Sequence, residues 1–450
     1  MWMEVQALDY QRGKAPWIPR SLALFALASA SWFSAAIPAA ELPLTLADAQ
    51  HRAVERSRQL AAQDASIAAS REMAVAAGQL PDPTVKLGVQ NVPVDGADRY
   101  SIGRDFMTMR YVGVMQELTR SDKRELRSKR FEREAEKTRA ERIAATAAIE
   151  RDAALAWLDR YYAEAMAKVI AEEARAAQLE IGAAEGSYRA GRGSQADVLS
   201  AHSARVSIED RASELDRRVR NGKTVLARWI GEGADAPLAE RPPINAIPLN
   251  VATLDADLAH HPQIAVLTRQ EEIAETEAKL ARANKHADWS VELMYSRRGS
   301  SFSNMVSVGV SIPLQWDQNK RQDRELAAKL AMVDQAKAER EEMLRNHIAE
   351  MRAMVTDWEN GRERLARYSR ELIPLARERT RASLAAYPGN KVSLGDLLLA
   401  RRNEIDVRLQ ALQLEMDTAR LWAQLNFFVP QDHATYNEFP PPQNHSKVSQ

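Results

Sequence analysis

Apolar positions three and four residues apart fill most of this chain, and stretches in which apolar and polar residues alternate one by one interrupt that spacing. The helical spacing covers residues 45–79, the alternation follows at 84–92 and 106–118, and the helical spacing returns from 121 to 181. The first pattern is typical of an amphipathic helix and the second of a strand with two unlike faces. The sequence therefore predicts a helix, a β-hairpin and a second helix about 90 Å long.

The same order recurs in the second half of the chain. A stretch rich in proline and glycine, residues 231–250, separates the two halves and is predicted to be a linker. The predicted elements beyond it are a helix, two strands and a long helix, at 253–284, 289–295, 305–314 and 322–386. The period of about 200 residues indicates an internal duplication, with repeats at 41–230 and 251–429.

Composition adds information mainly about the two ends of the chain. There are 450 residues, as many Asp and Glu as Lys and Arg (62 of each), and no cysteine. The charge balance gives no indication of nucleic-acid binding, and disulfides, thiolate sites and an acylated N-terminal cysteine are excluded. Residues 1–40 combine basic residues, a short apolar run and small residues, which predicts a secretory signal peptide; an N-terminal membrane anchor is the alternative. Residues 430–450 lack periodicity and are predicted to be a disordered tail.

The four predicted strands are too few to close a barrel within one chain, because about eight are needed to enclose even packed side chains. An open sheet edge is not viable in lipid, so membrane strands would have to come from several copies, eight from two or twelve from three. The last strand fits this, since Val306, Val308 and Val310 form an apolar face and Ser307 and Gly309 a small polar one. A small hairpin packed on helices in a soluble protein explains the apolar face equally well.

Taken together, these features resemble the TolC-like outer-membrane efflux channels over residues 42–429. The resemblance is carried by the duplicated helix–hairpin–helix order and by four pairs of segments, which are the openings "LTLADAQHRAVERSRQL" and "ATLDADLAHHPQI", the strands "VGVMQEL" and "VGVSIPL", and the turns "YRAGRGSQADVL" and "YPGNKVSLGDLL". It implies a mainly α-helical chain with two β-hairpins that forms a homotrimer. Its twelve-stranded β-barrel would lie in the outer-membrane lipid of a Gram-negative bacterium and continue as a long α-helical tunnel through the periplasm.

The resemblance also implies partners and a cargo. A periplasmic adaptor (a membrane fusion protein) and an inner-membrane RND transporter would complete a tripartite pump, with this chain as its passive exit channel. The stretch "RDFMTMRYVGVMQELTRSDKRELR" is most similar to the heavy-metal branch, which exports cations such as copper or silver. An exit duct for drugs or secreted proteins is the alternative within this class. A periplasmic coiled-coil scaffold or adaptor is the alternative from another class.

Methionines mark the predicted pore-facing side of the strands. If Val112 and Val114 face lipid, the opposite face of the strands carries Tyr111 and five methionines, which are Met107, Met109, Met115, Met294 and Met305. Thioethers are soft ligands that suit Cu(I) or Ag(I), so a loose lining could pass such ions along. Methionine is also an adaptable filler where strand gives way to helix, and this second interpretation stays open.

Two turns with matching residues are expected to lie at the far end of the long helices. The resemblance makes them the closed, adaptor-docking tip of the tunnel, built from Tyr188, Gly191, Gly193, Ser194, Asp197 and Leu199 and from Tyr387, Gly389, Ser393, Asp396 and Leu398. Locally, Gly191 or Gly193 ends one helix in left-handed geometry, while Ser194 and Asp197 form a capping box for the next. We expect Asp197 and Asp396 to cap their helices and also to form carboxylate rings at the aperture.

No catalytic set or cofactor motif is apparent, so the chain is not expected to be an enzyme. His260 and His261 are adjacent but precede Pro262 at a helical bend, which favours a structural role over a metal site. The many carboxylates are expected on exposed helix faces, paired with Arg or Lys four residues away.

Overall fold

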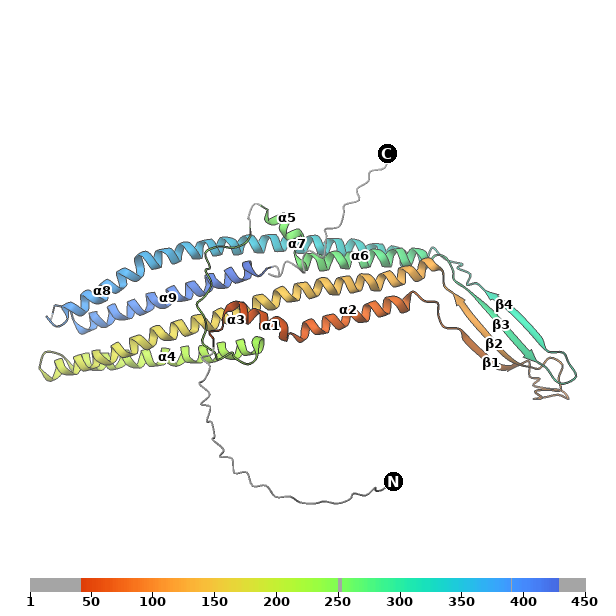
Figure 1. Cartoon of the computed structure of the whole chain (residues 1–450), viewed down its shortest axis with the longest axis horizontal. Coiled ribbons are helices and arrows are strands. Elements are labelled where there is room, and N and C mark those ends of the chain that lie inside the picture. Colours follow the sequence, from red (N-terminus) through yellow and green to blue (C-terminus); the bar gives the residue numbers. More distant parts are fainter. Residues whose placement is uncertain (1–41, 250–252, 390, 429–450) are drawn as a thin grey trace, which may run out of the picture. The chain divides into compact units, whose positions relative to one another are not determined.

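The computed structural model describes residues 42–249, 253–389 and 391–428, all within one compact unit that begins at Leu42. The predicted signal peptide and the predicted C-terminal tail lie outside these residues. The elements are, in order, α1 (Leu46–Arg56), α2 (Arg58–Ala77), β1 (Thr84–Gln90), β2 (Met109–Leu118), α3 (Ser121–Arg189), α4 (Gln195–Ile230), α5 (Leu254–Ala259), α6 (Pro262–Ala283), β3 (Trp289–Arg297), β4 (Met305–Ser311), α7 (Gln322–Arg367), the π-helical turn η1 (Tyr368–Leu372), α8 (Ile373–Ala386) and α9 (Leu394–Asn426). The predicted repetition of helix, hairpin, long helix, turn and helix is present (Figure 1).

The first predicted helix is in fact two helices. α1 begins at a capping box in which the backbone N–H of Asp48 donates to Oγ1 of Thr45 at 3.0 Å. Ser57 then leaves the helical conformation (ψ 114°), and its side chain accepts a hydrogen bond from the backbone N–H of Leu60 and so caps α2. The uninterrupted helix expected at 45–79 is therefore wrong at Ser57, while its end at Gly78 is confirmed.

The longest element, α3, has 69 residues and hence a length of roughly 100 Å. It packs against α2, α4, α6 and α9, so helices from both halves share one long partner. The second long helix differs from its counterpart, because the π-helical turn η1 separates α7 from α8. Pro374 at the start of α8 has no N–H to donate to the preceding turn, which accounts for the change in hydrogen bonding.

The two hairpins join into one antiparallel sheet with strand order β1-β2-β3-β4. The central contact pairs Val112 with Tyr295 and Val114 with Leu293. Each outer strand pairs on one side only within the described chain, so β1 and β4 both present a free edge. Figure 1 shows the sheet continuing from the ends of α2, α3, α6 and α7.

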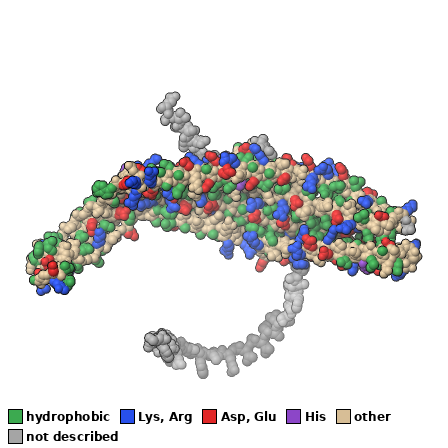
Figure 2. Space-filling view, turned by 180° about the vertical axis from the view of Figure 1, so that it is seen from behind, with side chains coloured by type: hydrophobic (Ala, Val, Ile, Leu, Met, Phe, Trp, Pro, Cys, Tyr) green, Lys and Arg blue, Asp and Glu red, His purple; other side chains and the backbone are tan. Residues whose placement is uncertain are grey.

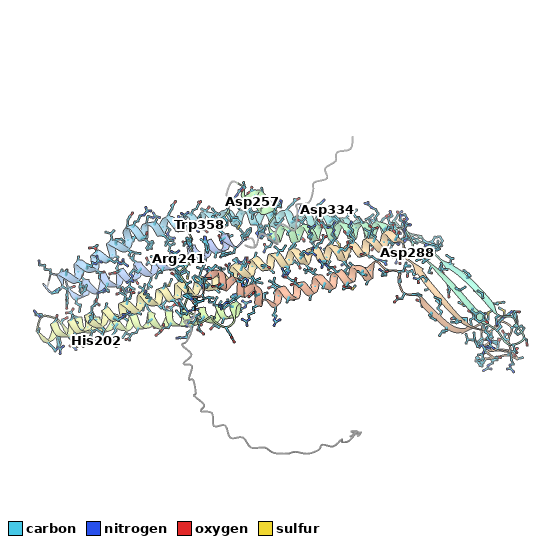
Figure 3. The ribbon with its side chains drawn as sticks, viewed as in Figure 1. His202, Arg241, Asp257, Asp288, Asp334 and Trp358 are labelled. Carbon is cyan, nitrogen blue, oxygen red and sulfur yellow. The ribbon has the colours of Figure 1, made fainter. Side chains whose placement is uncertain are left out.

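The linker is bound along the helices. Leu44 pairs with Leu238 as an isolated β-bridge, and its backbone N–H donates to the carbonyl of Pro237 at 2.8 Å. Three tryptophan indoles also donate to this part of the chain, namely Trp157 to the carbonyl of Leu44 (3.0 Å), Trp358 to Ile244 (3.2 Å) and Trp422 to Ala246 (2.9 Å). Trp358 of α7 and Trp422 of α9 bind the linker itself, whereas Trp157 of α3 binds Leu44, which pairs with the linker. Figure 3 labels Trp358 and the linker residue Arg241.

The main core lies where the linker meets these helices. Trp157, Leu158, Tyr162 and Met351 are almost completely buried there, together with linker residues such as Ile244. Along the helices the surface seen in Figure 2 mixes Lys and Arg with Asp and Glu side chains. Within the described residues, no helix contains an apolar stretch long enough to cross a bilayer.

Candidate functional site

The two faces of the sheet have different compositions. Residues paired across antiparallel strands lie on the same face, so the register fixes each face without reference to its surroundings. One face carries the apolar rows Leu87–Val112–Tyr295–Val306 and Val85–Val114–Leu293–Val308. All eight side chains are exposed in the single chain, from 45% for Val112 to 73% for Leu87. The predicted placement of Val112, Val114, Val308 and Val310 on one face is confirmed.

The opposite face carries four of the five predicted methionines. Met109, Met115, Met294 and Met305 lie on it with Tyr111, whereas Met107 precedes β2 and belongs to the loop. The four methionines occupy four different rows: Met109 is opposite Gln90, Met305 opposite Ser296, Met294 opposite Gly113, and Met115 opposite Glu292. They therefore line the face one row after another and do not converge on a single point.

The same face also holds a charged pair that connects the two hairpins. Nζ of Lys86 on β1 lies 3.2 Å from Oε1 of Glu292 on β3. The contact crosses β2, on which Gly113, a residue without a side chain, is the register partner of Lys86. A second small residue has a similar role, since the ring of Tyr111 lies over Gly88. Glycines at these places leave room for the larger side chains to cross the face.

The two turns predicted to form one tip are in contact. Ile181, Ala184 and Ala201 form a buried cluster with Leu394 and Leu397, so the end of α3 and the beginning of α4 pack on the beginning of α9. Val198, Tyr387 and Leu398 pack against this cluster, and Oγ of Ser187 lies 3.5 Å from Oη of Tyr387. The side chains of Tyr188 and Leu199 are instead 50% and 61% exposed.

The helix caps at these turns agree with the sequence in most respects. Oδ2 of Asp197 accepts hydrogen bonds from the backbone N–H and the hydroxyl of Ser194, both at 2.8 Å, and these bonds lower the pKa of Asp197. At the second turn the hydroxyl of Ser393 donates to Oδ2 of Asp396 at 2.7 Å. Gly191 has the expected positive φ of 69°, with Gly193 two residues on. Gly389 does not lie in the left-handed region, so the expectation that it repeats the role of Gly191 is wrong.

Buried ion pairs near the tip were missed by the sequence reasoning. Glu173 and Glu180 on α3 are 5% and 7% exposed and meet arginines of α9, with Nη1 of Arg408 3.2 Å from Glu173 and Nε of Arg401 3.0 Å from Glu180. Burial raises the pKa of Glu173, and the two arginines only partly oppose that effect. The expectation of exposed carboxylates paired four residues away is therefore wrong here, because the partners are more than 200 residues distant in sequence.

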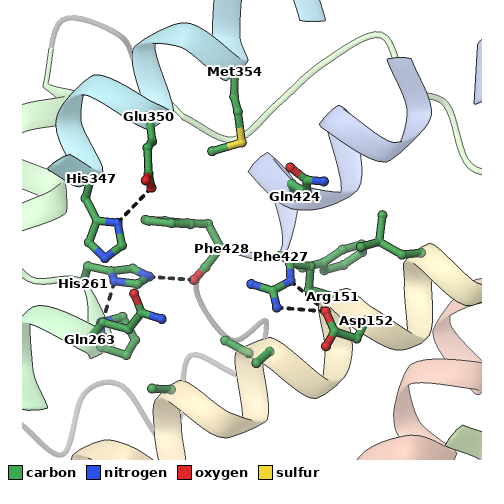
Figure 4. A pocket seen from close by; sticks show the side chains of 15 residues that line it. Arg151, Asp152, His261, Gln263, His347, Glu350, Met354, Gln424, Phe427 and Phe428 are labelled. Carbon is green, nitrogen blue, oxygen red and sulfur yellow. Dashed lines mark hydrogen bonds and ion pairs between the residues drawn. The ribbon is translucent and has the colours of Figure 1, made fainter. Parts of the chain in front are cut away.

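His261 lies beside a pocket of about 440 Å³ between α3, α6, α7 and α9 (Figure 4). Its ring stacks on Phe428 with centroids 3.8 Å apart, its Nε2 lies 3.1 Å from the carbonyl of Phe428, and its Nδ1 accepts from the backbone N–H of Gln263. Burial lowers the pKa of His261 to about 4. Both ring nitrogens are engaged, and no cluster of three or more potential His, Asp or Glu ligands occurs in the described parts of the chain. The structural role expected for His261 fits these contacts.

Solved structures of other proteins share this architecture. No family model matches the chain, and no curated protein matches it. Solved structures do match, and they show that the chain has the fold of bacterial outer-membrane channel proteins. VceC of Vibrio cholerae is 18% identical over 85% of this chain and 95% of its own, with a TM-score of 0.70.

Two further solved structures have the same fold. The outer-membrane channel CmeC of Campylobacter jejuni is 12% identical, covers 87% of this chain and 88% of its own, and has a TM-score of 0.68. CusC, described with its transmembrane channel formation, is 14% identical, covers 85% and 91%, and has a TM-score of 0.71. At identities this low, the structural similarity establishes the fold of the present chain and nothing further.

Proposed function

We propose that this chain is the outer-membrane channel of a tripartite efflux pump. The observation that carries the proposal is the sheet, which exposes an entire apolar face and leaves both edge strands unpaired within the described chain. Exposed apolar surface of this extent is typical of contact with a membrane or another protein. β2 and β3, with 10 and 9 residues, have the length that crosses a bilayer at a tilt.

Three copies would close the free edges. Each copy supplies four strands, so a trimer has twelve, with β4 of one copy beside β1 of the next. The long helices would then continue the barrel as a periplasmic tunnel whose tip, formed by the turns at 190–194 and 387–393, docks a periplasmic adaptor. An inner-membrane RND transporter would supply the energy, and we propose no catalytic step in this chain.

Fractionation tests this proposal. We expect the mature chain in the outer membrane, migrating as a trimer in detergent gels before heating and as a monomer afterwards. A monomer in the soluble periplasmic fraction would contradict the proposal and favour the scaffold or adaptor alternative.

Heavy-metal cations, copper or silver, are the proposed cargo. The support is the methionine lining of the non-apolar face, whose thioethers are soft enough to contact such ions without holding them. Replacing Met109, Met115, Met294 and Met305 by leucine should lower copper tolerance of the cell. The control replaces exposed helical methionines, Met73, Met332 and Met343. Equal tolerance of both variants would remove the metal assignment and favour a duct whose cargo, drugs or proteins, is chosen upstream.

The aspartates of the two turns are the proposed aperture. Three copies would bring six carboxylates, from Asp197 and Asp396, to the tip. Replacing both by asparagine keeps a side-chain oxygen that can accept the capping hydrogen bonds, so the helices should persist while cation conductance changes. The control is Asp210→Asn with Asp216→Asn on α4. Unchanged conductance and gating would leave the two aspartates with the capping role alone.

A further inference from the structure

Two arginines face each other at one end of the apolar face of the sheet. Arg110 on β2 and Arg297 on β3 are direct register partners, and both side chains are exposed. They lie on the apolar face because the next row on that face pairs Val112 with Tyr295. On β1 the residue opposite Arg110 is Val89, so an apolar side chain borders the pair.

This juxtaposition is unfavourable unless something neutralises it. Like charges directly opposite on neighbouring strands repel. Neither guanidinium contacts an acidic side chain within the residues that the structure describes. Two acids of the preceding loop are already engaged, since Asp98 lies 3.5 Å from Arg104, and Oδ1 of Asp105 accepts a hydrogen bond from the backbone N–H of Met107 at 2.8 Å.

Arg298, the residue after Arg297, already has contacts of its own and so differs from the two paired arginines. Nε of Arg298 donates to the carbonyl oxygen of Ser303 at 2.8 Å, and its guanidinium lies over the ring of Phe302. Arg298 therefore shapes the short loop between β3 and β4, whereas the two paired arginines keep their donors free for a ligand.

The position of the pair along the strands indicates what that ligand is. The other end of the same apolar face is Trp289, paired with Leu118 where the strands meet the helices. Arg297 lies eight positions beyond Trp289 on β3, a distance of about 26 Å along the strand. A strand tilted by about 40° rises about 20 Å over that length, which is most of the lipid-facing band of roughly 25 Å. The apolar rows therefore lie within that band, and the arginines lie near its outer boundary, close to the lipid headgroups.

We infer that Arg110 and Arg297 together bind the phosphate group of an anionic lipid in the outer leaflet. This rests on the proposed function, because the membrane placement of the sheet is what brings lipid to this face. Guanidinium groups present paired N–H donors that match phosphate oxygens, and the shared anion offsets the repulsion between the two cations. The apolar rows below would hold the acyl chains of the same lipid.

Lipid retention on the purified full-length protein tests the inference. Native mass spectrometry measures binding of phosphatidic acid, with phosphatidylcholine as the lipid without net charge and inorganic phosphate as the competitor. We expect the wild type to prefer phosphatidic acid and the variant Arg110→Gln with Arg297→Gln to bind it about 25-fold more weakly, about five-fold for each arginine. Arg110→Lys with Arg297→Lys should lose less, because the charge stays and only the paired donors are lost.

A matched control removes two charges elsewhere. Arg217 and Arg220 are exposed on α4, and Arg217→Gln with Arg220→Gln should bind phosphatidic acid as the wild type does. Equal binding by the two glutamine variants would overturn the inference. Full displacement of the lipid by inorganic phosphate would overturn it too, because the site would then be one for free phosphate.

Failure of this inference is distinguishable from failure of the proposed function. Lipid preference is measured on purified protein, while the channel assignment is tested by fractionation of cells. A wild type that sits in the outer membrane as a trimer but shows no preference for phosphatidic acid would overturn the lipid site alone. A soluble periplasmic monomer would overturn the proposed function.

Discussion

Replacing Arg160 by methionine tests whether the linker is held on the helices by a buried cation. Arg160 lies on α3 and is 2% exposed. Its guanidinium donates from Nη1 to the carbonyl of Ala234, from Nη2 to that of Ala236 (2.8 Å) and from Nε to Glu164 (2.7 Å). Methionine fills much of the same space but donates nothing, so two buried carbonyl oxygens of the linker lose their partner.

The magnitude follows from the kind of bond that is lost. Each hydrogen bond from a charged donor contributes about 1.5–3 kcal/mol, so the two linker bonds contribute about 3–6 kcal/mol against local opening. Glu164 adds little to the loss, because its side chain is 35% exposed and water replaces the guanidinium there. We therefore expect opening of the linker to become easier by about 3–5 kcal/mol.

Hydrogen exchange measures this opening at particular amides. The N–H of Ala236 donates to the carbonyl of Gly233, and the N–H of Ala239 to that of Leu44, so both report on the linker. A loss of about 3 kcal/mol speeds their exchange more than a hundred-fold. The control, Arg218→Met, removes a surface pair with Glu214 and should change exchange by less than about three-fold. Exchange in Arg160→Met that matches this control would refute the reasoning.

Two further predictions concern helix packing and pH. Gly361→Ala on α7 should lower the free energy of unfolding by about 1–3 kcal/mol, because the added Cβ would lie 2.4 Å from Oγ1 of Thr418 on α9. The control is Gly182→Ala, whose Cβ would meet nothing within 4 Å and which should raise the free energy of unfolding by about 0.5–1 kcal/mol. Equal shifts in melting temperature for the two variants would contradict the packing argument. Burial lowers the pKa of His261 from 6.5 to about 4, so the imidazole is neutral in the folded protein. Its contribution to the free energy of unfolding is complete above pH 6.5, and about 3 kcal/mol of it is lost as the pH falls toward 4. Melting between those pH values should drop more for the wild type than for His261→Gln, and parallel curves would contradict this.

The helix caps and the strand alternation were predictable because the residues that interact in them lie close together in sequence. The capping pairs at Thr45 and Ser194 and the alternation of the strands depend on neighbours two or three residues away. The π-helical turn could have been expected from Pro374 within the long helical pattern. The break at Ser57 has no glycine or proline to mark it, and it coincides with a tertiary contact in which Arg56 donates to the carbonyl of Ala227 on α4.

Contacts between the two halves could not be predicted from spacing alone. The pairing of Arg110 with Arg297 depends on the register of β2 against β3, which strands from different hairpins fix only in the folded chain. The same holds for Glu173 and Arg408 near the tip. The hydrophobic pattern did predict which side of each strand is apolar, because the alternation of side chains along a strand does not depend on which strand pairs with it.

Cysteine cross-linking between the two edge strands tests the central claim that three copies close one ring. The native chain has no cysteine, so every cross-link formed by a variant comes from introduced residues. Single cysteines are placed on the apolar faces of both edge strands and combined in pairs, at Val85, Leu87 or Val89 of β1 with Val306, Val308 or Val310 of β4. We predict a covalent ladder in outer membranes that ends at the trimer for at least one pair, and none for a cysteine on β1 alone. A ladder that ends at the dimer, or no cross-link for any pair, would contradict the closed trimer.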